Sequence, residues 1–393
     1  MKIVDVETFL VGNPPPSRGG GKWIFVKLTT DDGIEGMGEI YAPMVNPQFV
    51  PQLVQSWVDR FLIDTDPFNI ELMWRKIYAA GYDQHPDTTK VAMMSGLEIA
   101  CWDIIGKALG QPIYNLLGGK YHEKLRSYTY LYPEDDADRD PQRRAQGDPQ
   151  IAGERAVYYM KMGFTAIKFD PIRLIGYLAP IQVGLEALET AELVVKNVRE
   201  AVGDKCDILI GTHGQMTTSS AIRLAKRLEK YDPLWYEEPV PPENRQEMAR
   251  VARHTSIPIA TGERLSTKYE FREVLEYQAA TILQFAMGRV GGILEAKKIA
   301  GMAEAYYAQI APHLYAGPIE ALASIQLDTC SPNFLIQESI ETFGGFYAEI
   351  LKKPIQWEDG YIIPPTEPGL GIELNEDVVK AHPYTGTAPG LGG

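Results

Sequence analysis

The chain has 393 residues, a formal net charge of −14 and 45% hydrophobic residues. This length permits several small domains, or one large barrel with a smaller domain. The acidic balance argues against nucleic acid as a partner, because phosphate binding requires clustered lysine and arginine side chains. Small anionic ligands are not excluded, since local positive groups rather than net charge attract them.

The N-terminal sequence and the hydrophobic profile argue against export and membrane insertion. The opening residues MKIVDVETFLVG alternate like a strand and lack the apolar run of a signal peptide. No stretch approaches the roughly 20 apolar residues that span a bilayer. Cys101, Cys206 and Cys330 are far apart and odd in number, which indicates reduced, buried thiols. We therefore expect a cytoplasmic protein with no membrane partner.

The first 110 residues predict a strand meander followed by helices. The segments KIVDVETFLV, KWIFVKLTTDDG and GIEGMGEIY are strand-like, and the first two flank GNPPPSRGGG, a glycine- and proline-rich loop that we interpret as a lid. Helical patterns cover residues 47–80, and the polar loop AAGYDQHPDTTK follows them. The apolar segment VAMMSGLEIACWDIIGKALG then predicts a helix that ends at Gly110.

From residue 125 onward, short apolar runs alternate with helical patterns. The alternation predicts a parallel sheet covered by helices, and eight runs suit a TIM-type barrel. The charged segment PEDDADRDPQRRAQGDPQ after the first run predicts an exposed insertion. The eight runs are residues 125–131, 166–170, 207–211, 234–239, 257–263, 280–285, 307–313 and 333–339.

Polar residues stand where most of these runs end, and barrel enzymes carry their function at this end of the strands. Glu237 and Glu263 end adjacent runs, and Gly211 has the corresponding position one run earlier. Two carboxylates in one cavity repel each other unless a cation or proton lies between them, and such hard oxygen ligands suit Mg²⁺. The alternative is that each carboxylate pairs with a cation of the chain, for which Lys168 and Arg264 are available.

Histidines are the candidate proton carriers, because their side chains titrate near neutral pH. His213 and His313 both follow barrel strands, whereas His85 lies in a polar loop where substrate contact and simple exposure are both open. Lys168, two residues before Asp170, could be a base, an electrophile or half of a structural ion pair.

These residues resemble the enolase superfamily, in its mandelate racemase subgroup, and within that subgroup the mannonate- and gluconate-type acid-sugar dehydratases. The likeness covers nearly the whole chain. The segment SGLEIACWDIIGKALGQPIYNLLGGK is similar to the family's helix and turn between its two domains. The segments WYEEP, ATGE, RVGGI, APH and PGLGIEL resemble its barrel and tail signatures in the right order.

The resemblance implies an α/β fold, a modified TIM barrel of the (β/α)7β type over residues 125–350. An α+β capping domain would comprise residues 1–124 and be completed by residues 351–393. The loops GNPPPSRGGG and AAGYDQHPDTTK match the two loops with which family members select their substrate. The resemblance further suggests a homo-oligomer, from dimer to octamer.

The implied activity is that of a carbon–oxygen lyase on a small sugar acid, an aldonate or aldarate. Such an enzyme removes the proton α to the carboxylate, with Mg²⁺ stabilising the enediolate, and then expels the β-hydroxyl to give a 2-keto-3-deoxy acid. By resemblance, Glu237 and Glu263 are metal ligands, His213 is the acid and His313 is the base.

The remaining site residues are assigned to the substrate. Lys168 matches the family's lysine near the substrate carboxylate, which makes it a third catalytic candidate. Asp170 has the position where other members carry a second base, and Glu338 falls near the acidic residue of the eighth strand. We assign Asp170 and Glu338 to substrate binding together with His85 and Arg264.

Two departures from the family pattern affect the chemistry. Gly211 replaces the first acidic metal ligand, which is expected to weaken Mg²⁺ binding and to open space beside His213. Phe285 and Ala286 replace a Pro-Asp pair whose Asp orients the seventh-strand histidine, so His313 is expected to lack its partner. Two alternatives therefore stay open: an epimerase or cycloisomerase with little need of metal, and an inactive sugar-acid-binding member.

Overall fold

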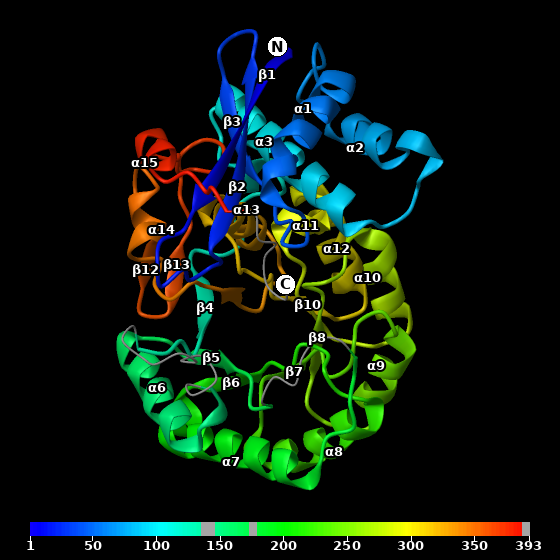
Figure 1. Cartoon of the computed structure of the whole chain (residues 1–393), viewed down its shortest axis with the longest axis vertical. Helices are drawn as coiled ribbons and strands as arrows, with labels where there is room; N and C mark the ends of the chain where they lie inside the picture. Colours follow the sequence, from blue (N-terminus) through cyan, green and yellow to red (C-terminus); the bar gives the residue numbers. More distant parts are fainter. Residues whose placement is uncertain (135–145, 173–178, 387–393) are drawn as a thin grey trace.

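The structure is a computed structural model that describes residues 1–134, 146–172 and 179–386 (Figure 1). Its N-terminal part contains a three-stranded antiparallel sheet in the order β1-β2-β3, as the alternating segments predict. The loop that we interpret as a lid connects the first two strands. The strands are β1 (Ile3–Gly12), β2 (Lys22–Thr30) and β3 (Glu35–Glu39).

Helices pack against this sheet and form the upper end of the molecule in Figure 1. The longest is the predicted apolar helix. Its first turn is capped by Asp87, which accepts a hydrogen bond from the Lys90 amide, and it ends at Gly110 in the left-handed conformation, which glycine adopts without steric cost. The helices are α1 (Val50–Phe61), α2 (Ile70–Tyr78), α3 (Thr88–Leu109) and α4 (Ile113–Leu116), with short 3-10 turns at Pro47–Phe49 and Ala80–Tyr82.

A second sheet forms the predicted barrel. Seven strands pair in parallel from β4 to β10, and the eighth, β11, pairs with β4. A parallel bridge between Ile310 and Phe334 joins the last two strands and closes the ring. The strands are β4 (Leu125–Tyr130), β5 (Ala166–Phe169), β6 (Asp207–Ile210), β7 (Trp235–Glu237), β8 (Ile259–Thr261), β9 (Ile282–Leu283), β10 (Gln309–Ile310) and β11 (Gln337–Glu338).

Helices connect successive barrel strands and cover the outside of the ring, so the (β/α)7β prediction is confirmed (Figure 1). Inside the barrel, Tyr128 packs edge to face against Trp235. The connecting helices are α6 (Pro149–Met162), α7 (Leu185–Val202), α8 (Thr218–Leu228), α9 (Arg245–Ala252), α10 (Thr267–Glu276), α12 (Ile293–Ala305) and α13 (Pro318–Thr329). Shorter elements are α11 (Met287–Val290) and 3-10 turns at Gly203–Lys205 and Glu229–Tyr231.

The C-terminal segment contacts both parts of the molecule. The hairpin of β12 (Gln356–Glu358) and β13 (Tyr361–Ile363) pairs with β4 and so extends the barrel sheet. Farther on, the Tyr384 amide donates to the Leu10 carbonyl, and Glu376 forms an ion pair with Lys27 of the N-terminal sheet. The predicted boundaries after residues 124 and 350 stay a prediction. The helices here are α14 (Phe346–Glu349) and α15 (Glu376–Ala381).

Three smaller expectations concern the cysteines, the charged insertion and membrane helices. Cys101, Cys206 and Cys330 are free and buried, as predicted. Most of the predicted charged insertion falls at residues 135–145, outside the described residues. Within the described ranges, no helix has the length and apolar character needed to cross a membrane.

Glycines allow β3 to lie directly on α3. A Cβ atom on Gly38 would come within 1.8 Å of the Gly96 carbonyl oxygen, and one on Gly96 within 2.4 Å of Ile40. Backbone atoms cannot yield as a flexible side chain can, so side chains at these positions would force the helix away from the sheet.

We therefore expect Gly38→Ala to lower the free energy of unfolding by about 1–3 kcal/mol, because overpacking must displace backbone. Chemical denaturation monitored by circular dichroism measures this change. The matched control is Gly301→Ala, on an exposed turn of α12 with no atom within 4 Å of the new Cβ. The control should be neutral or slightly stabilising. Equal stability of the two variants would contradict the close-packing argument.

Candidate functional site

The barrel strands bring most of the predicted residues to one end of the ring. Lys168 belongs to β5, His213 follows β6, Glu237 ends β7 and Glu263 follows β8. On the other side of the ring, His313 follows β10 and Glu338 ends β11. Parallel strands share their carboxyl-terminal edge, so these side chains meet there although the sequence separates them widely.

Lys168 is the centre of this group. Its ammonium lies 2.5 Å from Glu237 Oε1 and 3.7 Å from Glu338 Oε1, and the side chain is completely buried. Burial acts to lower the pKa of Lys168, but the charges of Glu237 and Glu338 raise that pKa well above its usual value. Burial likewise raises the pKa of Glu237, and Lys168 opposes that rise. Of the three roles left open for Lys168, the structure shows an ion pair.

The expectation that His313 lacks a partner is wrong. Its Nδ1 atom lies 3.0 Å from Glu338 Oε2 and 3.3 Å from Glu263 Oε2. Burial acts to lower the pKa of His313, and the charges of Glu338 and then Glu263 raise it overall. Ala286 on the sixth strand contributes only a backbone bridge to His313. The sequence comparison missed this pairing because the carboxylates come from other strands.

The space expected beside Gly211 is also filled. A Cβ atom at position 211 would lie 2.1 Å from Asp170 Oδ1 and 3.1 Å from the Tyr130 hydroxyl. Asp170 is held by that hydroxyl, which donates to Oδ1 at 3.2 Å, and its Oδ2 lies 2.7 Å from His213 Nδ1. The absence of a side chain at Gly211 is therefore what lets Asp170 reach His213.

This pairing shifts the acidity of His213. Burial acts to lower its pKa, but the charge and hydrogen bond of Asp170 raise the pKa to about 10. His213 is thus held in its protonated form at neutral pH, with about a quarter of its side chain exposed. A protonated, partly exposed histidine can donate a proton to a bound ligand.

The backbone around His213 is constrained. His213 (φ 49°) and Glu238 (φ 40°) both lie in the left-handed region, which non-glycine residues rarely adopt. The Thr212 hydroxyl lies 2.8 Å from the carbonyls of Glu237 and Glu238, and the Gly214 amide donates to the Glu238 carbonyl. These bonds hold the two strand ends in place against the conformational strain.

Arg264 and His85, which the sequence assigned to substrate binding, are not part of the group around Lys168. Arg264 Nη2 lies 2.5 Å from the buried carboxylate of Glu238, so its charge is already paired within the chain. His85 is exposed in the loop between α2 and α3.

The structure adds residues that the sequence did not single out as site residues. Trp235 and Gln284 both donate hydrogen bonds to Glu237 Oε2, at 3.0 and 2.8 Å. Tyr41 stacks on His313 with ring centroids 6.1 Å apart, and Arg289 lies over the Tyr41 ring. Gln284 lies one residue before the end of the sixth run, so its position was a signal, whereas nothing in the sequence pairs Tyr41 with the barrel.

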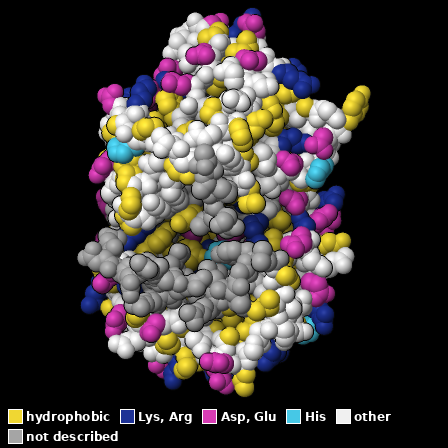
Figure 2. Space-filling model, viewed as in Figure 1, with side chains coloured by type: hydrophobic (Ala, Val, Ile, Leu, Met, Phe, Trp, Pro, Cys, Tyr) yellow, Lys and Arg dark blue, Asp and Glu magenta, His cyan; other side chains and the backbone are white. Residues whose placement is uncertain are grey.

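A cavity of about 410 Å³ lies beside this site. It is lined by the predicted lid loop, including Ser17 and Gly20, and by Tyr41 and Tyr315. Figure 2 shows hydrophobic side chains gathered in a hollow across the middle of one face, while acidic and basic side chains are interspersed elsewhere on its described surface. Since Tyr41 touches both the cavity and His313, the cavity adjoins the candidate site.

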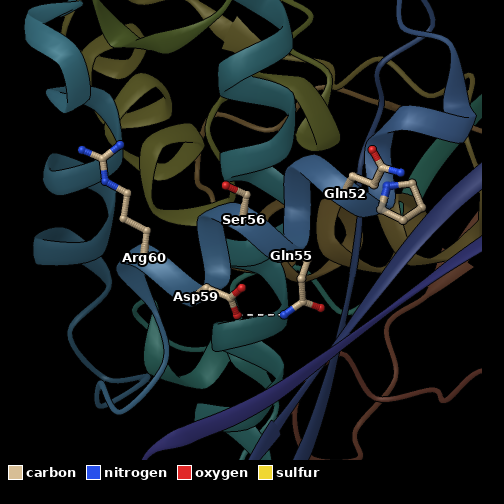
Figure 3. Close-up of a pocket in the computed structure, with 6 residues that line it drawn as sticks. Gln52, Gln55, Ser56, Asp59 and Arg60 are labelled. Atoms are coloured by element: carbon tan, nitrogen blue, oxygen red, sulfur yellow. Dashed lines mark hydrogen bonds between the residues drawn. The ribbon is translucent and has the colours of Figure 1, made fainter.

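A second hollow, of about 690 Å³, lies along α1 (Figure 3). Its polar side chains include Gln55, which donates to Asp59 at 2.8 Å, and Arg60. Figure 3 shows these side chains projecting from a single helix. None of the predicted site residues lines this hollow, so we do not connect it with the chemistry.

The side chains present do not fit a magnesium site with three carboxylate ligands. Gly211 supplies no ligand, and both oxygens of Glu237 already accept hydrogen bonds from the protein. In the part of the chain that the structure describes, no group of three or more His, Cys, Asp or Glu side chains is arranged to hold a metal ion.

Fold and site together define a barrel protein of the (β/α)7β class, with paired charges at the carboxyl end of its strands. The sequence matches two family models: "Mandelate racemase / muconate lactonizing enzyme, N-terminal domain" over residues 15–118, and "Enolase C-terminal domain-like" over residues 152–378. The chain belongs to the mandelate racemase/muconate lactonizing enzyme family of the enolase superfamily.

Relatives with assigned activities include sugar-acid dehydratases. A D-xylonate dehydratase from Haloferax volcanii is 34% identical over 391 residues, covering 98% of this chain and 90% of the relative. A D-galactonate dehydratase from Ralstonia pickettii is 35% identical over 389 residues, covering 96% of this chain and 94% of the relative. Among solved structures, a mandelate racemase/muconate lactonizing enzyme family protein from Labrenzia alexandrii is similar with a TM-score of 0.96 and 58% identity, covering 100% of this chain and 99% of the other.

Gly211→Ala tests the Asp170–His213 pair. The new methyl group should displace the Asp170 carboxylate, so the pKa of His213 should fall from about 10 toward its ordinary value. Because that pKa is raised by folding, the pair stabilises the protein fully below about pH 6.5 and loses its effect as the pH rises through the folded pKa. The stability loss of the variant should therefore be largest in acid and smallest in alkali.

The measurements are histidine NMR titration and unfolding as a function of pH. Asp170→Asn should lower the His213 pKa in the same way. Gly184→Ala, where the new Cβ meets no atom within 4 Å, should leave it unchanged. An unaltered His213 pKa in Gly211→Ala would show that Asp170 is not displaced.

Proposed function

We propose that the protein is a dehydratase of a sugar acid, an aldonate or aldarate, giving a 2-keto-3-deoxy acid. One observation carries the proposal: His213 and His313 follow β6 and β10, four positions apart in the ring of eight strands, and each is paired through Nδ1 with a carboxylate. Two proton carriers on opposite sides of one barrel end suit the loss of a proton and a hydroxyl from neighbouring carbons. The named activities of the full-length relatives support this reading.

The two histidines receive different roles. His213, held protonated by Asp170, donates its proton to the departing β-hydroxyl, which leaves as water. His313 accepts the α-proton at Nε2, because its Nδ1 faces Glu338. The enol that remains gains a proton at the β-carbon and becomes the ketone. Proton transfer of this kind contributes about 10²- to 10⁴-fold in rate.

Lys168 supplies fixed positive charge near the reacting carboxylate. Removing a proton α to a carboxylate builds negative charge on the carboxylate oxygens, and a preorganised cation in a buried site stabilises that charge. In this proposal Asp170 orients His213 and Glu338 orients His313. These roles take the place of the substrate contacts that the sequence predicted for the two carboxylates. The predicted substrate roles of His85 and Arg264, and the predicted Mg²⁺ ligands Glu237 and Glu263, remain predictions.

The activity test is a panel of aldonic and aldaric acids of several chain lengths, incubated with and without Mg²⁺ and assayed for 2-keto products. We expect at least one acid to give a keto product. A panel without any keto product would reject the dehydratase. If no keto product forms but the α-proton exchanges with solvent, the protein is an epimerase. If a sugar acid binds tightly without such exchange, the protein is an inactive binding member.

Variants in D₂O separate the two histidines. His213→Asn should lose dehydration by about 10²- to 10⁴-fold while α-proton exchange persists, because only the acid is removed. His313→Asn should lose both reactions. His254→Asn, at an exposed position on a surface turn, serves as the control. Loss of exchange in His213→Asn with exchange retained in His313→Asn would reverse the assigned roles.

The pH dependence of kcat/KM follows from the same pairs. His313 must lose its proton to act as a base, and its raised pKa places the acid limb above the ordinary value of about 6.5. His213 must keep its proton, so the basic limb should fall near pH 10. The expected optimum is therefore alkaline, and Asp170→Asn should move the basic limb to lower pH. An optimum below pH 6 would contradict this assignment.

A further inference from the structure

The ammonium of Lys168 takes a position that a bound cation would otherwise need. It projects from β5 toward Glu237 and Glu338, with its side chain 1% exposed, and its charge also acts on Glu263. The nearest carboxylate oxygen is 2.5 Å away, on Glu237, which is one of the two predicted metal ligands. A divalent ion held by the same oxygen would have to displace the ammonium, because two cations in contact repel strongly in a buried site.

Glu237 has little capacity left for a further ligand. Oε1 faces Lys168, and Oε2 accepts hydrogen bonds from Trp235 and Gln284. The indole nitrogen can only donate, so the Trp235 contact cannot be reversed. Binding a metal through Glu237 would therefore break hydrogen bonds of a buried carboxylate, and lost buried partners are costly.

Charges of the chain itself nearly balance this end of the barrel. Four cationic groups, two of them the raised-pKa histidines, contact five buried or nearly buried carboxylates. Such pairing removes the repulsion that would otherwise draw in a divalent ion. The carboxylates are Asp170, Glu237, Glu238, Glu263 and Glu338, and their partners are Lys168, His213, Arg264 and His313.

We propose that Lys168 serves as a built-in cation in place of a bound divalent metal, so that the site binds no Mg²⁺ while Lys168 is present. The rings of Tyr130 and Tyr128, at 5.0 and 6.0 Å from Nζ, line the ammonium on another side. The proposal concerns the cation of the proposed active site, and it rests on that site's location but on no particular substrate.

The test is Mg²⁺ titration of chelator-treated, full-length protein, followed by calorimetry and by thermal unfolding. The wild type should show no saturable heat and no change in Tm up to about 10 mM Mg²⁺. Lys168→Ala leaves three carboxylates without the ammonium, so it should unfold at lower temperature without metal. With Mg²⁺ its Tm should rise by about 2–4 °C.

Three further variants sharpen this result. Lys168→Met keeps the side-chain volume and should also gain Mg²⁺ binding, which guards against a cavity that prevents folding. Lys168→Arg keeps the charge and should stay insensitive to Mg²⁺. Adding Glu237→Gln to Lys168→Ala should abolish the gained response, because it removes one of the exposed ligands.

Saturable one-to-one binding of Mg²⁺ to the wild type with a sub-millimolar Kd would overturn the proposal. So would folded Lys168→Ala and Lys168→Met proteins that both fail to bind Mg²⁺. Such binding to the wild type would overturn the proposal even if neither variant folds. Because no substrate is used, a negative activity screen would reject the dehydratase and leave this result standing.

Discussion

Carboxylates that are buried together at the end of a barrel must be paired, because an isolated ionised group loses too much hydration energy to remain charged there. In this protein the buried Glu237 carboxylate is paired with the equally buried ammonium of Lys168. Lys168 also approaches Glu338, which in turn faces His313. The protonation of the candidate base therefore depends on the same chain of charges that holds the strand ends together.

The two departures from the family pattern make sense within this network. At both positions a carboxylate is missing from the strand where the resemblance expects it, and another strand supplies one. Asp170 from the end of β5 lies over Gly211 and pairs with His213, and Glu338 of β11 replaces the absent partner at Ala286 and pairs with His313. The site thus keeps two histidine–carboxylate pairs while its predicted metal-binding half is reduced to Glu237 and Glu263.

The capping part of the molecule is tied to the same end of the barrel. Glu39 of β3 accepts hydrogen bonds from the Gly317 and Glu320 amides at the start of α13, where a carboxylate also suits the helix dipole. Arg18, in the predicted lid loop, forms an ion pair with Glu341 just beyond β11. These contacts hold the predicted lid loop beside the cavity that adjoins His313.

The sequence by itself determined the strands, the helices and the barrel, because hydrophobic periodicity and glycine positions act within short segments. The long apolar helix ending at Gly110 and the eight strand runs are examples. It also identified Lys168, His213 and His313 as strand-end residues. Only the tertiary structure decided their partners. Pairings such as Asp170 with His213, or Glu338 with His313, join different strands, and side-chain reach across a barrel leaves no local pattern in the chain.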